Sequence, residues 1–185
     1  MKKLIIIVLF IFSGCSSPHF DIIINNGKIA DGSGSKLFSA NIYIKNGKII
    51  EIGNLPNALG DKVLDAQDLI IAPGFIDMHT HAERRSLEFP TVENYLQQGV
   101  TTIVGGNCGG SPFPINDFME KTVQKGIGPN LALLIGHNTV RKEVMGTENR
   151  LATNKEIDEM QSIIQSAMNE GAFGMSTGLK YIPGA

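Results

Sequence analysis

Beyond residue 70, the sequence alternates short apolar segments with segments of helical periodicity. The apolar segments are 75–78, 101–104, 131–135 and 172–175, and helices are expected over 92–98, over 116–124 and after Thr153. Thr153 and Glu156 have the spacing of a capping box, and one apolar stripe follows them until Gly171. Strands that alternate with helices are joined by right-handed crossovers and run parallel. The pattern therefore predicts an α/β fold with about four parallel strands.

The length of the chain limits how much of such a fold it can hold. A complete (β/α)₈ barrel takes about 250 residues, or roughly 31 for each strand and helix. Residues 75–185 of this 185-residue chain therefore correspond to roughly three and a half such units. The last residues, 182–185, fall in the expected loop after the fourth strand. We expect the N-terminal half of a (β/α)₈ barrel, carried by a fragment.

The preceding segment has the period-two alternation of strands. Strands are expected over 20–24, 40–44 and 48–52, with turns at Asn26-Gly27 and Asn46-Gly47. Asn-Gly supplies the positive φ angles that a two-residue hairpin requires. Residues 31–35 and 54–61 have the composition of loops. This segment is predicted to form a small antiparallel β-domain.

The N-terminus has the outline of an export signal. Lys2 and Lys3 precede an apolar run over 4–12, which a cysteine at position 15 follows closely. Nine helical residues would rise about 13.5 Å, less than half of the roughly 30 Å of a bilayer core. The segment before Cys15 resembles the lipobox of bacterial lipoproteins, with Phe12 where that family usually has Leu. The resemblance implies lipidation at Cys15 and export to a bacterial membrane, which the chain contacts only through its acyl chains; a buried N-terminal strand is the alternative.

These patterns predict the following division of the chain: a lipoprotein-type signal peptide over 1–14, a tether over 15–19, the small β-domain over 20–72 and an incomplete (β/α) barrel over 73–185.

Charge and cysteine content restrict which partners the chain is expected to bind and what state its thiol is expected to be in. The net charge is -2, from 16 basic and 18 acidic residues, and the basic residues form no stripe. Nucleic acid is therefore not expected as a partner. If Cys15 is lipidated, Cys108 is the one remaining thiol, so an internal disulfide is excluded and this thiol is either buried or bound to something.

Two histidines follow the first strand of the barrel segment directly. On a strand, residues i and i+2 face the same side about 6.6 Å apart, so His79 and His81 would converge as divalent metal ligands. Such pairs also occur in solvated loops. Asp77 should point the same way one layer lower, where it either holds the tautomer of a ligand histidine or satisfies a buried network.

Cys108 lies in a glycine-rich loop after the second strand, Gly105-Gly106-Asn107-Cys108-Gly109-Gly110. A core cysteine is the usual interpretation of an unpaired thiol. The glycines leave few side chains to bury the sulfur and let the backbone approach a ligand closely. The loop also lies where barrel active sites form, and no lysine follows it as a phosphate-binding loop requires. Metal ligation is therefore expected.

The chain resembles the amidohydrolase superfamily, and within it the N-acyl-D-amino-acid deacylase (D-aminoacylase) branch. The resemblance is carried by Ala72-Pro73-Gly74-Phe75-Ile76-Asp77-Met78-His79-Thr80-His81, Gln98-Gly99-Val100-Thr101-Thr102 with Gly106-Asn107-Cys108-Gly109, Gly136-His137-Asn138-Thr139-Val140-Arg141 and Gly171-Ala172-Phe173-Gly174-Met175-Ser176-Thr177-Gly178-Leu179-Lys180-Tyr181.

The resemblance implies a site and an activity. His79 and His81 would bind one zinc, Cys108 would ligate the tighter or shared position of one or two divalent ions, and Tyr181 would lie beside the substrate. His137 would line or brace the site, and Lys180 is either a solvated loop residue or a substrate contact. Two more histidines and the aspartate that serves as general base are expected from strands beyond residue 185.

The activity implied is metal-dependent hydrolysis of non-peptide amide C–N bonds, in the first place of small-molecule N-acyl-D-amino acids or related amides. The alternative is a catalytically inactive, lipid-anchored remnant that binds metal weakly or not at all. A metallo-β-lactamase-type site is discounted, because it requires Asp-His after His-x-His, whereas Glu83-Arg84 follow here.

Overall fold

The computed structural model describes residues 17–183, which fall into two compact units, one ending at Pro73 and the other beginning at Gly74. The expected signal peptide over 1–14 and the lipidation site Cys15 lie outside the described residues. Within residues 17–183, no helix has both the length and the apolar composition needed to cross a bilayer.

The first unit contains a four-stranded sheet in the order β5-β4-β1-β6. Its strands are β1 (His19–Asn25), β4 (Asn41–Lys45), β5 (Lys48–Gly53) and β6 (Leu59–Asp65). Phe20, Ile23 and Tyr43 form its core, with the two aromatic rings 5.0 Å apart. β4 runs antiparallel to β1 and β5 as predicted, but β6 runs parallel to β1. The sheet is therefore mixed, and β6 begins inside the segment predicted as a loop.

Of the two predicted Asn-Gly hairpins, one is formed. Asn46 and Gly47 have φ angles of 52° and 69° and join β4 to β5. After Asn26-Gly27 the chain enters β2 (Lys28–Ile29), which pairs with β3 (Phe38–Ser39) and β7 (Ile70–Ile71) in a second sheet. Gly27 packs so closely against Ile71 that a Cβ would overlap that side chain. The hairpin prediction at Asn26 is therefore wrong, because this turn moves the chain between sheets.

The second unit is built on parallel strands that follow one another in chain order. They are β8 (Phe75–Asp77), β9 (Val100–Gly105), β10 (Asn130–Leu133), β11 (Ile135–Gly136) and β12 (Met175–Ser176). β9 lies between β8 and β10, and β11 pairs with β12, all in parallel. The third predicted strand is interrupted at Leu134, whose N–H donates to Gly105 O at 3.0 Å. The predicted α/β class with four parallel positions is confirmed.

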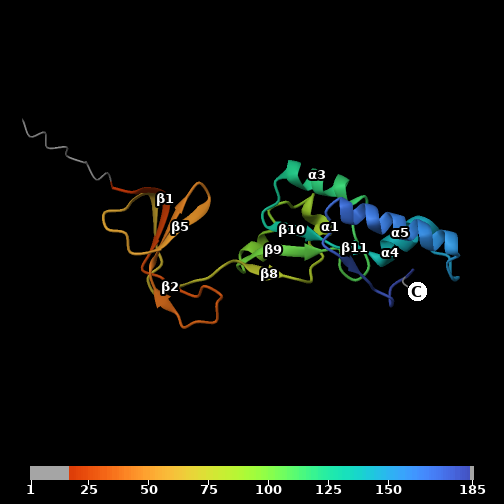
Figure 1. Ribbon diagram of the computed structural model, residues 1–185, viewed down its shortest axis with the longest axis horizontal. Coiled ribbons are helices and arrows are strands. Elements are labelled where there is room, and N and C mark those ends of the chain that lie inside the picture. Colours follow the sequence, from red (N-terminus) through yellow and green to blue (C-terminus); the bar gives the residue numbers. More distant parts are fainter. Residues whose placement is uncertain (1–16, 184–185) are drawn as a thin grey trace, which may run out of the picture. The chain divides into compact units, whose positions relative to one another are not determined.

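Helices connect these strands and cover them. They are α1 (Glu83–Ser86), α2 (Glu93–Leu96), α3 (Ile115–Lys125), α4 (His137–Met145) and α5 (Asn154–Asn169). Figure 1 shows α3 above β10, and α5 beside α4 and β11. One apolar cluster, Ile115, Leu133, Ile135, Val140 and Ala167, joins α3, α4 and α5 to the strands. Neither α1 nor α4 was predicted. In the case of α4, the helix begins directly after β11 without an intervening loop.

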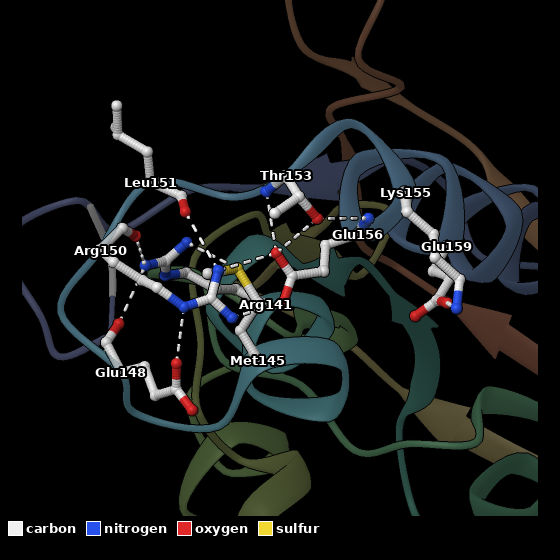
Figure 2. A network of polar contacts seen from close by, with 9 residues as sticks. All are labelled: Arg141, Met145, Glu148, Arg150, Leu151, Thr153, Lys155, Glu156 and Glu159. Carbon is white, nitrogen blue, oxygen red and sulfur yellow. Dashed lines mark hydrogen bonds and ion pairs between the residues drawn. The ribbon is translucent and has the colours of Figure 1, made fainter.

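A polar network fixes the connection between α4 and α5 (Figure 2). The buried guanidinium of Arg141 donates to Glu148 O at 3.1 Å and to Arg150 O at 2.8 Å. Arg150 in turn donates two hydrogen bonds to Glu156, at 2.8 and 2.6 Å. Thr153 and Glu156 form the predicted capping box. The start of α5 is therefore tied to the loop before it.

This network predicts a pH-dependent contribution to stability. The hydrogen bonds from Arg150, followed by those from Thr153, hold the pKa of Glu156 well below its ordinary value of 4.5. A carboxylate whose pKa is lowered by folding stabilises the protein fully above its unfolded pKa, and this contribution is lost as the pH falls through the folded pKa. Glu156→Gln should therefore lower the free energy of unfolding at pH 7, with the difference from wild type shrinking below about pH 4.5. Urea unfolding at several pH values measures this, and a difference that grows in acid would contradict it.

Candidate metal centre

The three predicted ligands converge at the carboxyl ends of two neighbouring parallel strands. His79 and His81 follow β8, and Cys108 follows β9. One donor atom from each lies within 4.8 Å of the other two. The Nε2 atom of His79 is 3.3 Å from Cys108 Sγ, and the two imidazole rings are nearly perpendicular, at 85°, with centroids 5.8 Å apart. The structure thus brings together the residues that the His-x-His spacing and the glycine loop indicated.

Hydrogen bonds between the two loops hold this geometry. The buried Thr80 donates its N–H and its Oγ1 hydrogen to Val104 O, both at 3.1 Å. Asn107 Nδ2 donates to Thr80 O at 3.3 Å and to Val104 O at 2.8 Å. Asp77 accepts a hydrogen bond from the backbone N–H of His79 at 3.1 Å, so it contacts the backbone of a predicted ligand and not its imidazole. Sequence reasoning did not identify Thr80 or Asn107.

Two glycines around Cys108 lie close to other segments of the protein. Gly106 has a φ of 76°, and a Cβ there would overlap the carbonyl oxygen of Leu134. Gly109 has a φ of 78°, and a Cβ there would lie 2.7 Å from Asn138 Oδ1. Gly106 and Gly109 therefore approach neighbouring protein segments closely. The loop is glycine-rich because the βα loops pack tightly on one another.

A cavity of about 440 Å³ opens beside His81 and Cys108. Tyr181, predicted beside the substrate, lines it. Two cationic residues, Arg84 and Lys142, also line it, and among residues 17–183 no carboxylate does. The remaining lining residues are Gly110, Asn138, Thr139, Ile182 and Pro183.

His137 does not line this cavity, although its neighbour Asn138 does. His137 Nδ1 lies 3.1 Å from Asn138 Oδ1. Asn138 Nδ2 donates to Gly178 O at 3.1 Å and to Tyr181 O at 3.4 Å, and its backbone N–H donates to Gly109 O at 2.8 Å. Asn138 therefore ties the Cys108 loop to the Tyr181 loop. Lys180, the other residue considered for substrate contact, lines a separate cavity of about 310 Å³.

An acidic side chain that the sequence did not single out lies behind the histidines. Glu83 is 1% exposed, and its Oε1 is 3.8 Å from His81 Nδ1. The only available signal for Glu83 was its place two residues after His81.

Burial, and then the charges of Asp77 and Glu83, raise the pKa of Tyr95. The Tyr95 phenol therefore stays protonated and neutral at neutral pH.

The chemistry of the donor set fits a divalent metal. Two imidazole nitrogens and one sulfur are ligands that zinc and other first-row divalent ions accept. Three of them within 4.8 Å of one another can surround one ion after small side-chain adjustments.

Parallel βα units with a candidate metal centre at the strands' carboxyl ends are the arrangement of metal-binding (β/α) barrels. A family model described as "Amidohydrolase family" matches residues 62–182, and the chain belongs to this family. The resemblance stated from the motifs is confirmed.

Relatives within the family are more specific. The chain is 33% identical to the N-acyl-D-aspartate deacylase of Alcaligenes xylosoxydans xylosoxydans, covering 88% of this chain and 37% of the relative. It is 33% identical to the D-aminoacylase of the same organism, covering 94% and 40%. The N-acyl-D-glutamate deacylase of Bordetella bronchiseptica, solved with zinc and a phosphonate mimic of the tetrahedral intermediate, superposes with a TM-score of 0.85 at 32% identity, covering 90% and 40%. The chain spans about two fifths of the length of these relatives.

Proposed function

We propose that the protein is a zinc-dependent amidohydrolase that removes the acyl group from N-acyl-D-amino acids. The observation that carries the proposal is the convergence of His79, His81 and Cys108 within 4.8 Å at the carboxyl ends of β8 and β9. Relatives named for deacylation of N-acyl-D-amino acids, which match about nine tenths of this chain, support the substrate class.

In this proposal, residues 17–183 supply part of the active site. Zinc, when bound, supplies a Lewis acid that polarises the scissile carbonyl and acidifies water. His79, His81 and Cys108 bind it, and the Thr80 and Asn107 hydrogen bonds keep the two ligand loops in register. The family resemblance assigns the aspartate general base and two further histidines to later strands of a complete barrel.

The cavity beside the ligands suits the other end of such a substrate. An N-acyl amino acid carries a free carboxylate near its scissile amide, and this group needs cationic or hydrogen-bonding partners. Arg84 and Lys142 line the cavity that His81 and Cys108 share, and no carboxylate among the lining residues opposes them. We assign them to the carboxylate, with Tyr181 covering the substrate beside it.

We also propose that the protein is exported and held at a bacterial membrane by acyl chains on Cys15. The basic pair Lys2-Lys3, the apolar run over 4–12 and the cysteine that follows support this.

A substrate panel tests the activity. Zinc-loaded protein that carries the complete barrel should hydrolyse N-acetyl-D-amino acids in preference to their L enantiomers, and a chelator should abolish turnover until zinc is restored. A folded, zinc-loaded protein with the complete barrel but without turnover on any member of the panel would overturn the proposal.

Substitution of the cationic residues tests the cavity assignment. Arg84→Ala and Lys142→Ala should each lower kcat/KM roughly 10- to 100-fold through a higher KM, since a hydrogen bond to a charged group contributes about 1.5–3 kcal/mol. The same variants should scarcely change kcat/KM for the matching substrate carboxamide. Lys155→Ala, which removes an exposed lysine paired with Glu159 on α5 (Figure 2), is the control. Equal losses for acid and carboxamide would contradict the assignment.

A further inference from the structure

Glu83 is the most deeply buried charged side chain among residues 17–183, with 1% of its surface exposed. Neither of its carboxylate oxygens has a hydrogen-bond partner within the described part of the chain. Burying an unpaired carboxylate is strongly unfavourable, and a native protein retains such a group where it serves a purpose. The fold also accommodates it specifically, because a Cβ on Gly105 would lie 2.7 Å from Glu83 Oε2.

The shorter of the two contacts between Glu83 and a cationic or imidazole side chain leads to a predicted metal ligand. His81 Nδ1 is 3.8 Å from Glu83 Oε1, and it too is buried and without a hydrogen-bond partner in residues 17–183. Two unsatisfied groups of complementary chemistry therefore face one another. A shift of less than about 1 Å would bring Oε1 and Nδ1 to hydrogen-bond distance and pair these two atoms.

We propose that Glu83 is a positioning residue for the metal centre: its carboxylate accepts the hydrogen on His81 Nδ1 and so commits Nε2 to the metal. The inference rests on the metal site of the proposed function. With Nδ1 shut off from solvent against Glu83, Nε2 is the ring nitrogen left to reach an ion. A carboxylate in this position fixes the tautomer and the ring orientation, and it raises the basicity of the ligand nitrogen.

Two other roles for Glu83 fit less well. An ion pair with Arg84 would be weak, since the Arg84 Nε atom is 4.0 Å away on a side chain that is 63% exposed. A direct catalytic role would require contact with the substrate, but Glu83 does not line the cavity that contains His81, Cys108 and Tyr181.

Glu83→Gln separates positioning from a structural role. Positioning predicts weaker zinc binding without loss of thermal stability, whereas a structural role predicts lower thermal stability with unchanged zinc binding. The variant keeps the shape and removes the charge, so zinc affinity should fall about 10- to 100-fold. The unfolding temperature of the zinc-free variant should equal or exceed that of wild type, because an uncompensated buried charge is gone. Competition with a chromophoric chelator and thermal unfolding of the whole protein provide the two values. Glu88→Gln, an exposed neighbour bonded to Arg85, is the matched control and should change neither.

Nitrogen-15 NMR of the wild-type protein tests the tautomer without any variant. In the zinc-loaded protein, His81 should carry its hydrogen on Nδ1 and bind through Nε2. A hydrogen on Nε2, or unchanged zinc affinity in folded Glu83→Gln, would overturn the inference. These measurements use zinc alone, so a failure of amide hydrolysis would count against the proposed function and leave this inference standing.

Discussion

Cys108→Ala is expected to weaken zinc binding by roughly 60- to 700-fold. Four-ligand zinc sites contribute about 10–16 kcal/mol, or about 2.5–4 kcal/mol for each ligand, and each 1.4 kcal/mol is tenfold in affinity. The sulfur lies 3.3 Å from His79 Nε2, so removing it takes away a donor that no neighbouring side chain in the described cluster replaces. Competition with a chromophoric chelator gives the affinity, and metal analysis after dialysis gives the stoichiometry.

Two controls make this result specific. His79→Ala should produce a loss of similar size, whereas His19→Ala, which removes an imidazole paired with Asp61 in the other unit, should not change zinc affinity. Thermal unfolding in the presence of a chelator establishes that each variant is folded. A folded Cys108→Ala protein with wild-type zinc affinity would mean that Cys108 is a core thiol.

Gly106→Ala is expected to lower the free energy of unfolding by about 3 kcal/mol. Of this, about 1 kcal/mol comes from a side chain at positive φ and about 2 kcal/mol from overpacking. Gly106 has a φ of 76°, and the added Cβ would overlap the Leu134 carbonyl oxygen. Relief requires Leu134 to move, and its N–H bond to Gly105 O joins the two βα units at this point. Urea unfolding measures the change.

Gly126→Ala provides a matched comparison, because Gly126 has a φ of 72° with no atom within 4 Å of an added Cβ. It should cost only about 1 kcal/mol, the backbone contribution alone. Equal losses in the two variants would show that the packing of the loops around Cys108 contributes nothing beyond backbone conformation.

Local patterns predicted the parts of the fold that local physics decides. The capping box at Thr153 and Glu156 and the hairpin at Asn46-Gly47 are formed by residues close in sequence, and both are present. The parallel pairing of β1 with β6 was not predicted, because it depends on which distant strand occupies the free edge of β1. α4 was missed because its first residue follows β11 directly, with no turn residues between them.

In the candidate site too, the sequence predicted what nearby residues decide and missed what distant residues decide. The His-x-His spacing indicated a pair of ligands, although both histidines follow β8 (Phe75–Asp77) and do not lie on it as the periodicity argument assumed. The predicted parallel order placed the Cys108 loop beside them. Glu83 was hidden because its importance lies in what surrounds it: burial to 1% exposure and an unsatisfied His81 Nδ1 3.8 Å away. Asn138 was hidden for a related reason, since its partners Gly109, Gly178 and Tyr181 lie on two other loops.

X-ray absorption fine structure at the zinc edge tests the central claim most directly. If His79, His81 and Cys108 bind one ion, the zinc-loaded protein should show one sulfur neighbour at about 2.3 Å together with nitrogen or oxygen neighbours at about 2.0–2.1 Å. The sulfur shell should vanish in Cys108→Ala. A zinc-loaded wild-type protein with nitrogen and oxygen neighbours alone would contradict the account.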